Sequence, residues 1–203
     1  MRLIIILIIL ALPYYIFGQF EQYLQDDPEP KSETQWGGAF SVVESGSGLG
    51  IFYAKPLKGF YHIGLNFDAF MLRDSKQFEY YDPYTGMYYT NRQNNVYLFD
   101  FLFTLKKRLL AYSIDDQFRP FVAVSAGPVF GMNFPEDHNQ KVSKNQYEWA
   151  ANVAAAAGVD VALDGNYLIG LRLQYRYMRF TGQLGERQNH SMFDVRLEFG
   201  KLF

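Results

Sequence analysis

The last thirteen residues, 191–203, constrain the fold more than any other part of the chain. Charged and apolar side chains alternate there, with Phe193, Val195, Leu197 and Phe199 on one face and Asp194, Arg196 and Glu198 on the other. A period of two is the pattern of a β-strand. The chain also begins with a very apolar run and ends on an aromatic residue. Together these features predict a closed barrel whose apolar side chains face lipid and whose charged side chains face the lumen.

Residues 1–18 have the pattern of a secretory signal. Arg2 is followed by an apolar run, a break at Pro13 and a small residue, Gly18. An uncleaved membrane anchor needs about twenty apolar residues, more than this run offers. We therefore expect a signal peptide that is cleaved after Gly18. Without a cysteine near that position, a lipoprotein anchor is not expected.

Residues 19–35 are polar and acidic, include Pro28 and Pro30, and have no apolar period. This composition predicts a flexible N-terminal extension on the periplasmic side. The extension would keep the precursor soluble or contact a periplasmic partner, and the sequence leaves both roles open.

Several functional classes are excluded or disfavoured by composition. The chain has no cysteine, which removes disulfides, thiol catalysis and cysteine-ligated metals. A net charge of −2 gives no field that would recruit nucleic acid. The three histidines, His62, His138 and His190, lie in separate segments, so we expect no metal and no cofactor. The glycines at 46, 48 and 50 indicate a turn and not a phosphate-binding loop, because no helix follows them.

From Trp36 onward, strand and turn patterns repeat to the end of the chain. We expect strands over 36–44, 49–55, 60–72, 95–106, 118–132, 147–163, 167–180 and 191–203. Long connections at 73–94, 133–146 and 181–190 alternate with shorter ones, which is typical of an outer-membrane barrel. The predicted fold is all-β: an eight-stranded antiparallel up-and-down transmembrane β-barrel over 36–203. The alternative, a soluble barrel of the lipocalin type, would be apolar inside and charged outside.

Three segments resemble known outer-membrane barrels. The closing residues 193–203 resemble the terminal signature by which the barrel-assembly machinery recognises its clients. Residues 119–130 and 154–179 are similar to strands of small outer-membrane barrels. The resemblance is to the OmpA, OmpX and PorT-like superfamily, and it covers the chain from about Trp36. It implies a location in the outer membrane of a Gram-negative-type bacterium and an assembly signal formed by Phe193, Val195, Leu197, Phe199 and Phe203. That superfamily hosts adhesins, small pores, structural barrels and a few enzymes.

Nine charged residues share the predicted lumen face: Asp68, Asp100, Lys106, Asp160, Arg172, Arg176, Asp194, Arg196 and Glu198. Neighbouring strands lie about 4.8 Å apart, within reach of arginine–carboxylate pairs. These residues would form either a gated polar pore or a salt-bridged plug. Eight strands leave an interior that side chains just fill, which favours the plug and a lumen that does not conduct.

The connection 73–94 is rich in aromatic residues: Phe78, Tyr80, Tyr81, Tyr84, Tyr88 and Tyr89. We expect a protruding hairpin around a turn at 82–86. Exposed tyrosines offer a large, rigid contact area, so the hairpin is also a candidate recognition surface. We therefore predict a monomeric barrel that presents its outer loops for adhesion or for binding a partner. The alternatives are a narrow conduit for small solutes or apolar molecules, and a barrel component of a secretion complex.

Two further groups of residues have a predicted role at the membrane surfaces. His190 and Ser191 fall at the outer end of the last strand, where some barrel enzymes keep catalytic residues. Adjacent strand residues point to opposite faces, so this pair is not expected to act as base and nucleophile, and no enzyme is predicted. Aromatic girdles are expected at the outer interface (Trp149, Tyr175, Tyr177 and Phe180) and at the inner interface (Phe118, Phe121 and Phe203).

Overall fold

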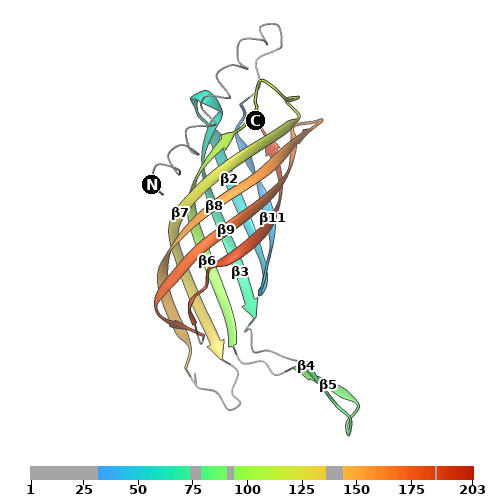
Figure 1. Ribbon diagram of the computed structural model, residues 1–203, viewed down its shortest axis with the longest axis vertical. Coiled ribbons are helices and arrows are strands. Elements are labelled where there is room, and N and C mark those ends of the chain that lie inside the picture. Colours follow the sequence, from blue (N-terminus) through green and yellow to red (C-terminus); the bar gives the residue numbers. More distant parts are fainter. Residues whose placement is uncertain (1–31, 74–78, 91–93, 136–143, 186) are drawn as a thin grey trace, which may run out of the picture.

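The computed structural model describes residues 32–73, 79–90, 94–135, 144–185 and 187–203 (Figure 1). Eight long strands form its main body: β1 (Gln35–Val43), β2 (Gly46–Pro56), β3 (Tyr61–Arg73), β6 (Asn94–Arg108), β7 (Phe118–Pro135), β8 (Gln146–Leu163), β9 (Tyr167–Leu184) and β11 (Met192–Leu202). The shorter elements are a 3-10 turn η1 (Lys58–Phe60), β4 (Glu79–Asp82), β5 (Met87–Thr90) and β10 (Arg187–Asn189). No helix in these described ranges is long and apolar enough to cross a membrane.

The long strands form a closed antiparallel barrel. Each pairs with the next long strand along the chain, and β11 pairs with β1, so no long strand keeps a free edge. Thr34 and Phe203 exchange backbone hydrogen bonds of 2.9 Å, which brings the start of β1 and the end of the chain together. We call this end of the barrel the inner mouth, and the end with the long connections the outer mouth (Figure 1). The predicted eight-stranded up-and-down barrel is confirmed.

Several predicted boundaries were wrong, most clearly at the first hairpin. Val43 pairs with Gly46, so the turn is only Glu44 and Ser45, and the glycines at 46 and 48 belong to β2. Gly46 leaves room for the backbone of β3 at Met71, and Gly48 leaves room for a lumen side chain. A Cβ on Gly48 would lie 2.5 Å from the Phe70 ring, closer than atoms can pack. The Gly-Ser-Gly sequence is therefore the start of β2, where the glycines allow close packing against β3. Strands β7 and β9 also extend beyond their predicted ends, to Pro135 and Leu184.

The barrel is apolar on its outer surface and largely polar within. Exposed apolar side chains occur on all eight long strands, for example Ile51, Leu65, Phe103, Leu173 and Phe199. The residues between them point inward and are buried, as the strict alternation of exposed and buried positions along β9 shows. Because a soluble monomer rarely exposes a continuous apolar surface of this kind, the outer face matches the predicted inverted arrangement.

Two predicted girdle residues do not face outward. Phe121 and Phe180 are buried in the lumen, so their assignment to the aromatic girdles was wrong. Each lies an even number of positions from a lumen-facing residue on its strand, Arg119 on β7 and Arg176 on β9, and so points to the same side. The remaining girdle residues are exposed: Phe118, Trp149, Tyr175, Tyr177 and Phe203.

Candidate functional site

The centre of the lumen is organised around Arg176 on β9. Its Nη2 lies 2.8 Å from Asp68 Oδ2, its Nη1 2.6 Å from Asp100 Oδ2, and its Nε 3.0 Å from Asp194 Oδ2. The three carboxylates come from β3, β6 and β11, and all four side chains are buried. The planar guanidinium has five donors in a fixed fork, so one arginine can bind three acids that converge from different strands.

A second arginine extends this network toward the inner mouth. Arg196 donates hydrogen bonds to Asp68 and, from Nε, to Glu198 Oε1 at 2.8 Å. The same Glu198 oxygen lies 2.9 Å from Arg172 Nη2. Asp68 and Glu198 therefore link all three arginines into one continuous network.

Between the network and the outer mouth, the lumen is filled by apolar side chains. One cluster of buried residues crosses it: Val43, Phe70, Leu72, Val96, Leu98, Val129, Met178, Phe180, Leu184 and Met192. The cluster adjoins the charges, because the guanidinium carbon of Arg176 lies 4.6 Å from the centre of the Phe70 ring. We call this cluster the apolar layer. This layer was not predicted from the sequence. Met178, Phe180 and Leu184 are separated from Arg176 by even numbers of positions along β9, so alternation places them on the same, lumen-facing side.

Between the network and the inner mouth, Lys106 and Asp160 form a further ion pair. Lys106 Nζ lies 2.6 Å from Asp160 Oδ2 and 2.5 Å from Gln35 Oε1. Phe121 contacts both this pair and the central network, with Lys106 Nζ 4.7 Å from its ring centre and the Arg172 guanidinium carbon 5.3 Å from it. All nine predicted lumen residues are thus buried inside the barrel.

Strands β4 and β5 form the predicted hairpin beyond the outer mouth (Figure 1). Asp82 closes its turn by accepting hydrogen bonds from the Tyr84 amide at 2.9 Å and the Thr85 hydroxyl at 3.0 Å. Tyr84 is 97% exposed and Tyr88 76% exposed. The rings of Tyr81 and Tyr88 pack as a pair, with centres 5.1 Å apart.

For three of the predicted recognition residues, the side chain lies outside the described part of the structure. Phe78 lies outside the described residues, as do the side chains of Tyr80 and Tyr89. The backbones of Tyr80 and Tyr89 pair with each other in the hairpin. Of the six predicted recognition residues, Tyr81, Tyr84 and Tyr88 are the ones whose side chains the structure describes.

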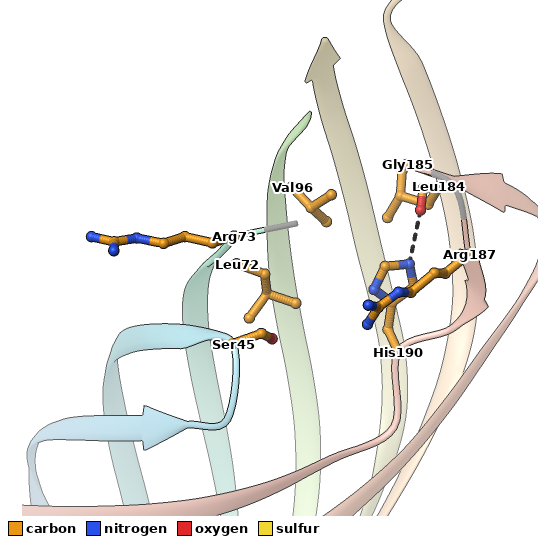
Figure 2. A pocket seen from close by; sticks show the side chains of 8 residues that line it. All are labelled: Ser45, Leu72, Arg73, Val96, Leu184, Gly185, Arg187 and His190. Atoms are coloured by element: carbon orange, nitrogen blue, oxygen red, sulfur yellow. Dashed lines mark hydrogen bonds between the residues drawn. The ribbon is translucent and has the colours of Figure 1, made fainter. Parts of the chain in front are cut away.

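A small pocket lies at the outer mouth (Figure 2). It is lined by Ser45, Leu72, Arg73, Val96, Leu184, Gly185, Arg187 and His190. His190 Nε2 lies 3.0 Å from the Leu184 carbonyl oxygen, and its ring meets the Phe180 ring edge-on. The Arg73 side chain points away from the other lining residues.

The same region contains His190 and Ser191, the pair considered above as a possible base and nucleophile. Ser191 Oγ accepts a hydrogen bond from the Met178 amide at 3.2 Å, so the serine and His190 have different partners. This arrangement offers no nucleophile–base pair. Within the described ranges, no group of three histidine or acidic residues is placed to hold a metal ion.

The sequence matches no protein-family model and no curated protein. Among solved structures, Neisserial surface protein A matches with a TM-score of 0.53 at 11% identity, over 82% of this chain and 92% of that one. The fold is that of a small outer-membrane β-barrel. Ail, the attachment invasion locus protein of Yersinia pestis, matches with a TM-score of 0.49 at 12% identity, over 87% and 100% of the two chains. The outer membrane protein OprG of Pseudomonas aeruginosa matches with a TM-score of 0.49 at 12% identity, over 87% and 98%.

Proposed function

We propose that this protein is a non-conducting barrel of the bacterial outer membrane that presents its outer hairpin to a partner. One observation carries the proposal: side chains fill the lumen from the charge network through the apolar layer, while tyrosines are exposed on the hairpin beyond it. Ions would have to cross a layer of apolar side chains that offers them no hydrogen bonds. The interior therefore acts as a rigid support, and the chemistry of recognition lies outside.

The outer surface supports the proposed location. Exposed apolar side chains on every long strand match a hydrocarbon environment, and the buried charges are paired inside. Residues 1–18 would direct export and be removed, and residues 19–35 would begin on the periplasmic side, where the inner mouth lies. No enzymatic activity is proposed, because the rim residues that would serve it have separate structural partners.

The last strand supports recognition by the barrel-assembly machinery. Phe193, Val195, Leu197 and Phe199 all point outward from β11, and the exposed Phe203 follows them. In the proposal, the assembly machinery binds this apolar face before β11 pairs with β1. In the finished barrel the same face lies against lipid. The barrel is proposed to act as a monomer.

The hairpin supports a role in adhesion or partner binding. Tyrosine rings combine an apolar face with a hydroxyl and have few rotatable bonds, so they lose little conformational entropy on binding. The turn that presents them is fixed by Asp82, and the two strands pair with each other rather than with the barrel. A partner can therefore contact both tyrosine-bearing strands without disturbing the barrel.

Two measurements test the proposal. The purified protein, folded as judged by a shift in gel mobility between unboiled and boiled samples, should give no single-channel steps in planar bilayers. Cells that display the double variant Tyr84→Ser/Tyr88→Ser should adhere less to surfaces and to each other than cells that display the wild type. The control is Tyr112→Ser, an exposed tyrosine at the inner mouth, which should leave adhesion unchanged. Regular conductance steps, or equal adhesion by all three proteins, would contradict the proposal.

A further inference from the structure

A second pocket lies at the inner mouth, at the opposite end of the barrel from the hairpin. It is lined by Gln35, His62, Lys106, Arg108, Arg119, Phe121 and Asp160, which come from β1, β3, β6, β7 and β8. All seven residues are at least nine-tenths buried. The Phe121 ring contacts Lys106 of the cup and Arg172 of the central network. We call this pocket the inner cup.

Two of its cations are held by a carboxylate of the 109–117 connection. Asp116 Oδ1 lies 2.7 Å from Arg108 Nη1, and Asp116 Oδ2 lies 2.9 Å from Arg119 Nη2. The Arg119 Nε also donates to the Asp116 backbone oxygen at 2.8 Å. Asp116 therefore joins the ends of β6 and β7 across the rim of the cup.

The other carboxylate at the rim belongs to the segment that precedes the barrel. Glu33 Oε2 lies 3.3 Å from both Nη1 and Nη2 of Arg119, and the Glu33 backbone lies close to the His62 ring. The next residue, Thr34, is held by its backbone pairing with Phe203. Gln35 then points into the cup and accepts from Lys106. Three successive residues, 33–35, are thus held at the inner mouth.

Among the described residues, Glu33 is one of three carboxylates that pair with the cations of the cup. Lys106, Arg108 and Arg119 carry three positive charges, and Asp160, Asp116 and Glu33 carry three negative ones. Arg172 pairs with Glu198, whose side chain lies beside that of Asp160 next to Gly170. Without Glu33, Arg119 would keep only its contact with Asp116, a carboxylate that it shares with Arg108, and losing one partner of a buried ion pair is unfavourable. Arginine pairs strongly with carboxylates, so the vacated position would suit another carboxylate.

We infer that the inner mouth is a carboxylate-binding site whose resident ligand is the chain's own Glu33. By occupying it, Glu33 holds the residues just before β1 at the mouth, and a free carboxylate competes for the same position on Arg119. The inference concerns the periplasmic end and does not depend on what the outer hairpin binds.

The absence of cysteine from the chain allows a direct test. In the full-length folded barrel, His62→Cys places a single thiol in the inner cup. Its reaction rates with an anionic and a cationic methanethiosulfonate report the local charge. The ratio of the anionic rate to the cationic rate rises as the site becomes more positive. Gln117→Cys, beside Asp116, is a second reporter that replaces the first if His62→Cys shows no mobility shift on boiling.

Glu33→Ala in this background should raise the ratio of anionic to cationic rates about tenfold, the effect of removing one nearby charge at an intermediate dielectric. Alanine also removes the bulk of the side chain, so added acetate should fill the position and return the ratio toward the starting value. Glu44→Ala is the matched control, since it removes the same charge from the outer mouth. It should leave the ratio unchanged.

Two results would overturn the inference. An unchanged ratio in Glu33→Ala would show that Glu33 does not neutralise the cup. A raised ratio that acetate does not lower would show that no carboxylate site exists there and that Glu33 acts only by covering the mouth.

Discussion

At the scale of single residues, the lumen contains an arrangement that looks unfavourable until all its partners are placed. Asp68 lies directly opposite Asp100 in the β3–β6 register, and Arg172 lies directly opposite Arg196 in the β9–β11 register. Like charges at such positions destabilise a sheet. Here each pair shares an opposite charge, because Arg176 binds both aspartates and Glu198 binds both arginines. The network is therefore a set of interdependent contacts and not a sum of separate pairs.

Arg176→Met tests this interdependence. The substitution leaves Asp68, Asp100 and Asp194 buried without their common cation, and removing one partner of a buried ion pair costs about 3–5 kcal/mol. We expect the free energy of unfolding in lipid vesicles, followed by tryptophan fluorescence during denaturant titration, to fall by at least that amount. Arg179→Met, at an exposed position on the same strand, should change it little. Equal effects of the two substitutions would show that the network does not stabilise the barrel.

The sequence predicted which charged side chains face the lumen but not which of them meet. The alternation along β9 and β11 fixes the face of Arg176 and Asp194, because a strand has only two faces. Their contacts depend on register, and a shift of strand pairing leaves the sequence pattern of each strand unchanged. The aromatic residues Phe121 and Phe180 were misplaced because aromatic side chains suit both a membrane interface and a lumen filled around arginines.

At the scale of elements, the connection between β6 and β7 is a structured clamp. Arg108 ends β6, Arg119 lies at the start of β7, and Asp116 binds both. From the sequence, this segment was predicted only as one of the shorter connections, because Arg108 and Asp116 are eight residues apart and match no local motif. The first hairpin was mispredicted for a similar reason. Its glycines were assigned to a turn, because their close packing against β3 is not visible in the local sequence.

The clamp predicts a specific dependence of stability on acid. Partial burial alone would raise the pKa of Asp116, but the hydrogen bond from Arg108 and the charge of Arg119 outweigh it, so the net pKa lies below the ordinary 3.8. A carboxyl with a lowered pKa stabilises the folded state fully above its unfolded pKa and progressively less as the pH falls through the folded value. The contribution of Asp116 should therefore be complete near neutral pH and be lost below about 3.8.

Asp116→Asn provides the measurement for this acid dependence. The difference in unfolding free energy between wild type and variant should be largest near neutral pH and should shrink as the pH falls below the ordinary carboxyl pKa. Asp115→Asn is the control, since Asp115 is exposed and its carboxylate accepts only the Gln117 amide among the contacts that the described structure gives it. A difference that stays constant across this pH range would contradict the proposed clamp.

At the scale of the whole molecule, the decisive property is that the barrel is inverted relative to a soluble one. Leu173 is exposed near the middle of β9, whereas its neighbours Arg172 and Gln174 are buried. The sequence predicted this property well, because alternation of apolar and charged residues extends over several strands and requires no knowledge of register. The location of the protein follows from the same feature, so a test of the outer face is also a test of the proposed membrane.

Leu173→Arg should therefore act very differently in the two possible environments. Arginine on the lipid face costs about 2–4 kcal/mol at the centre of the bilayer and about 0–1 kcal/mol near its surface. We expect Leu173→Arg to lower the free energy of unfolding in lipid vesicles by the larger amount. Tyr167→Arg, at the inner end of the same strand where Lys201 already packs over the ring, should lower it by the smaller amount. If the outer face instead met water, arginine at either position would be solvated equally, and the dependence on depth would disappear. A gradient of cost along β9 is thus the result that only a membrane-spanning barrel produces.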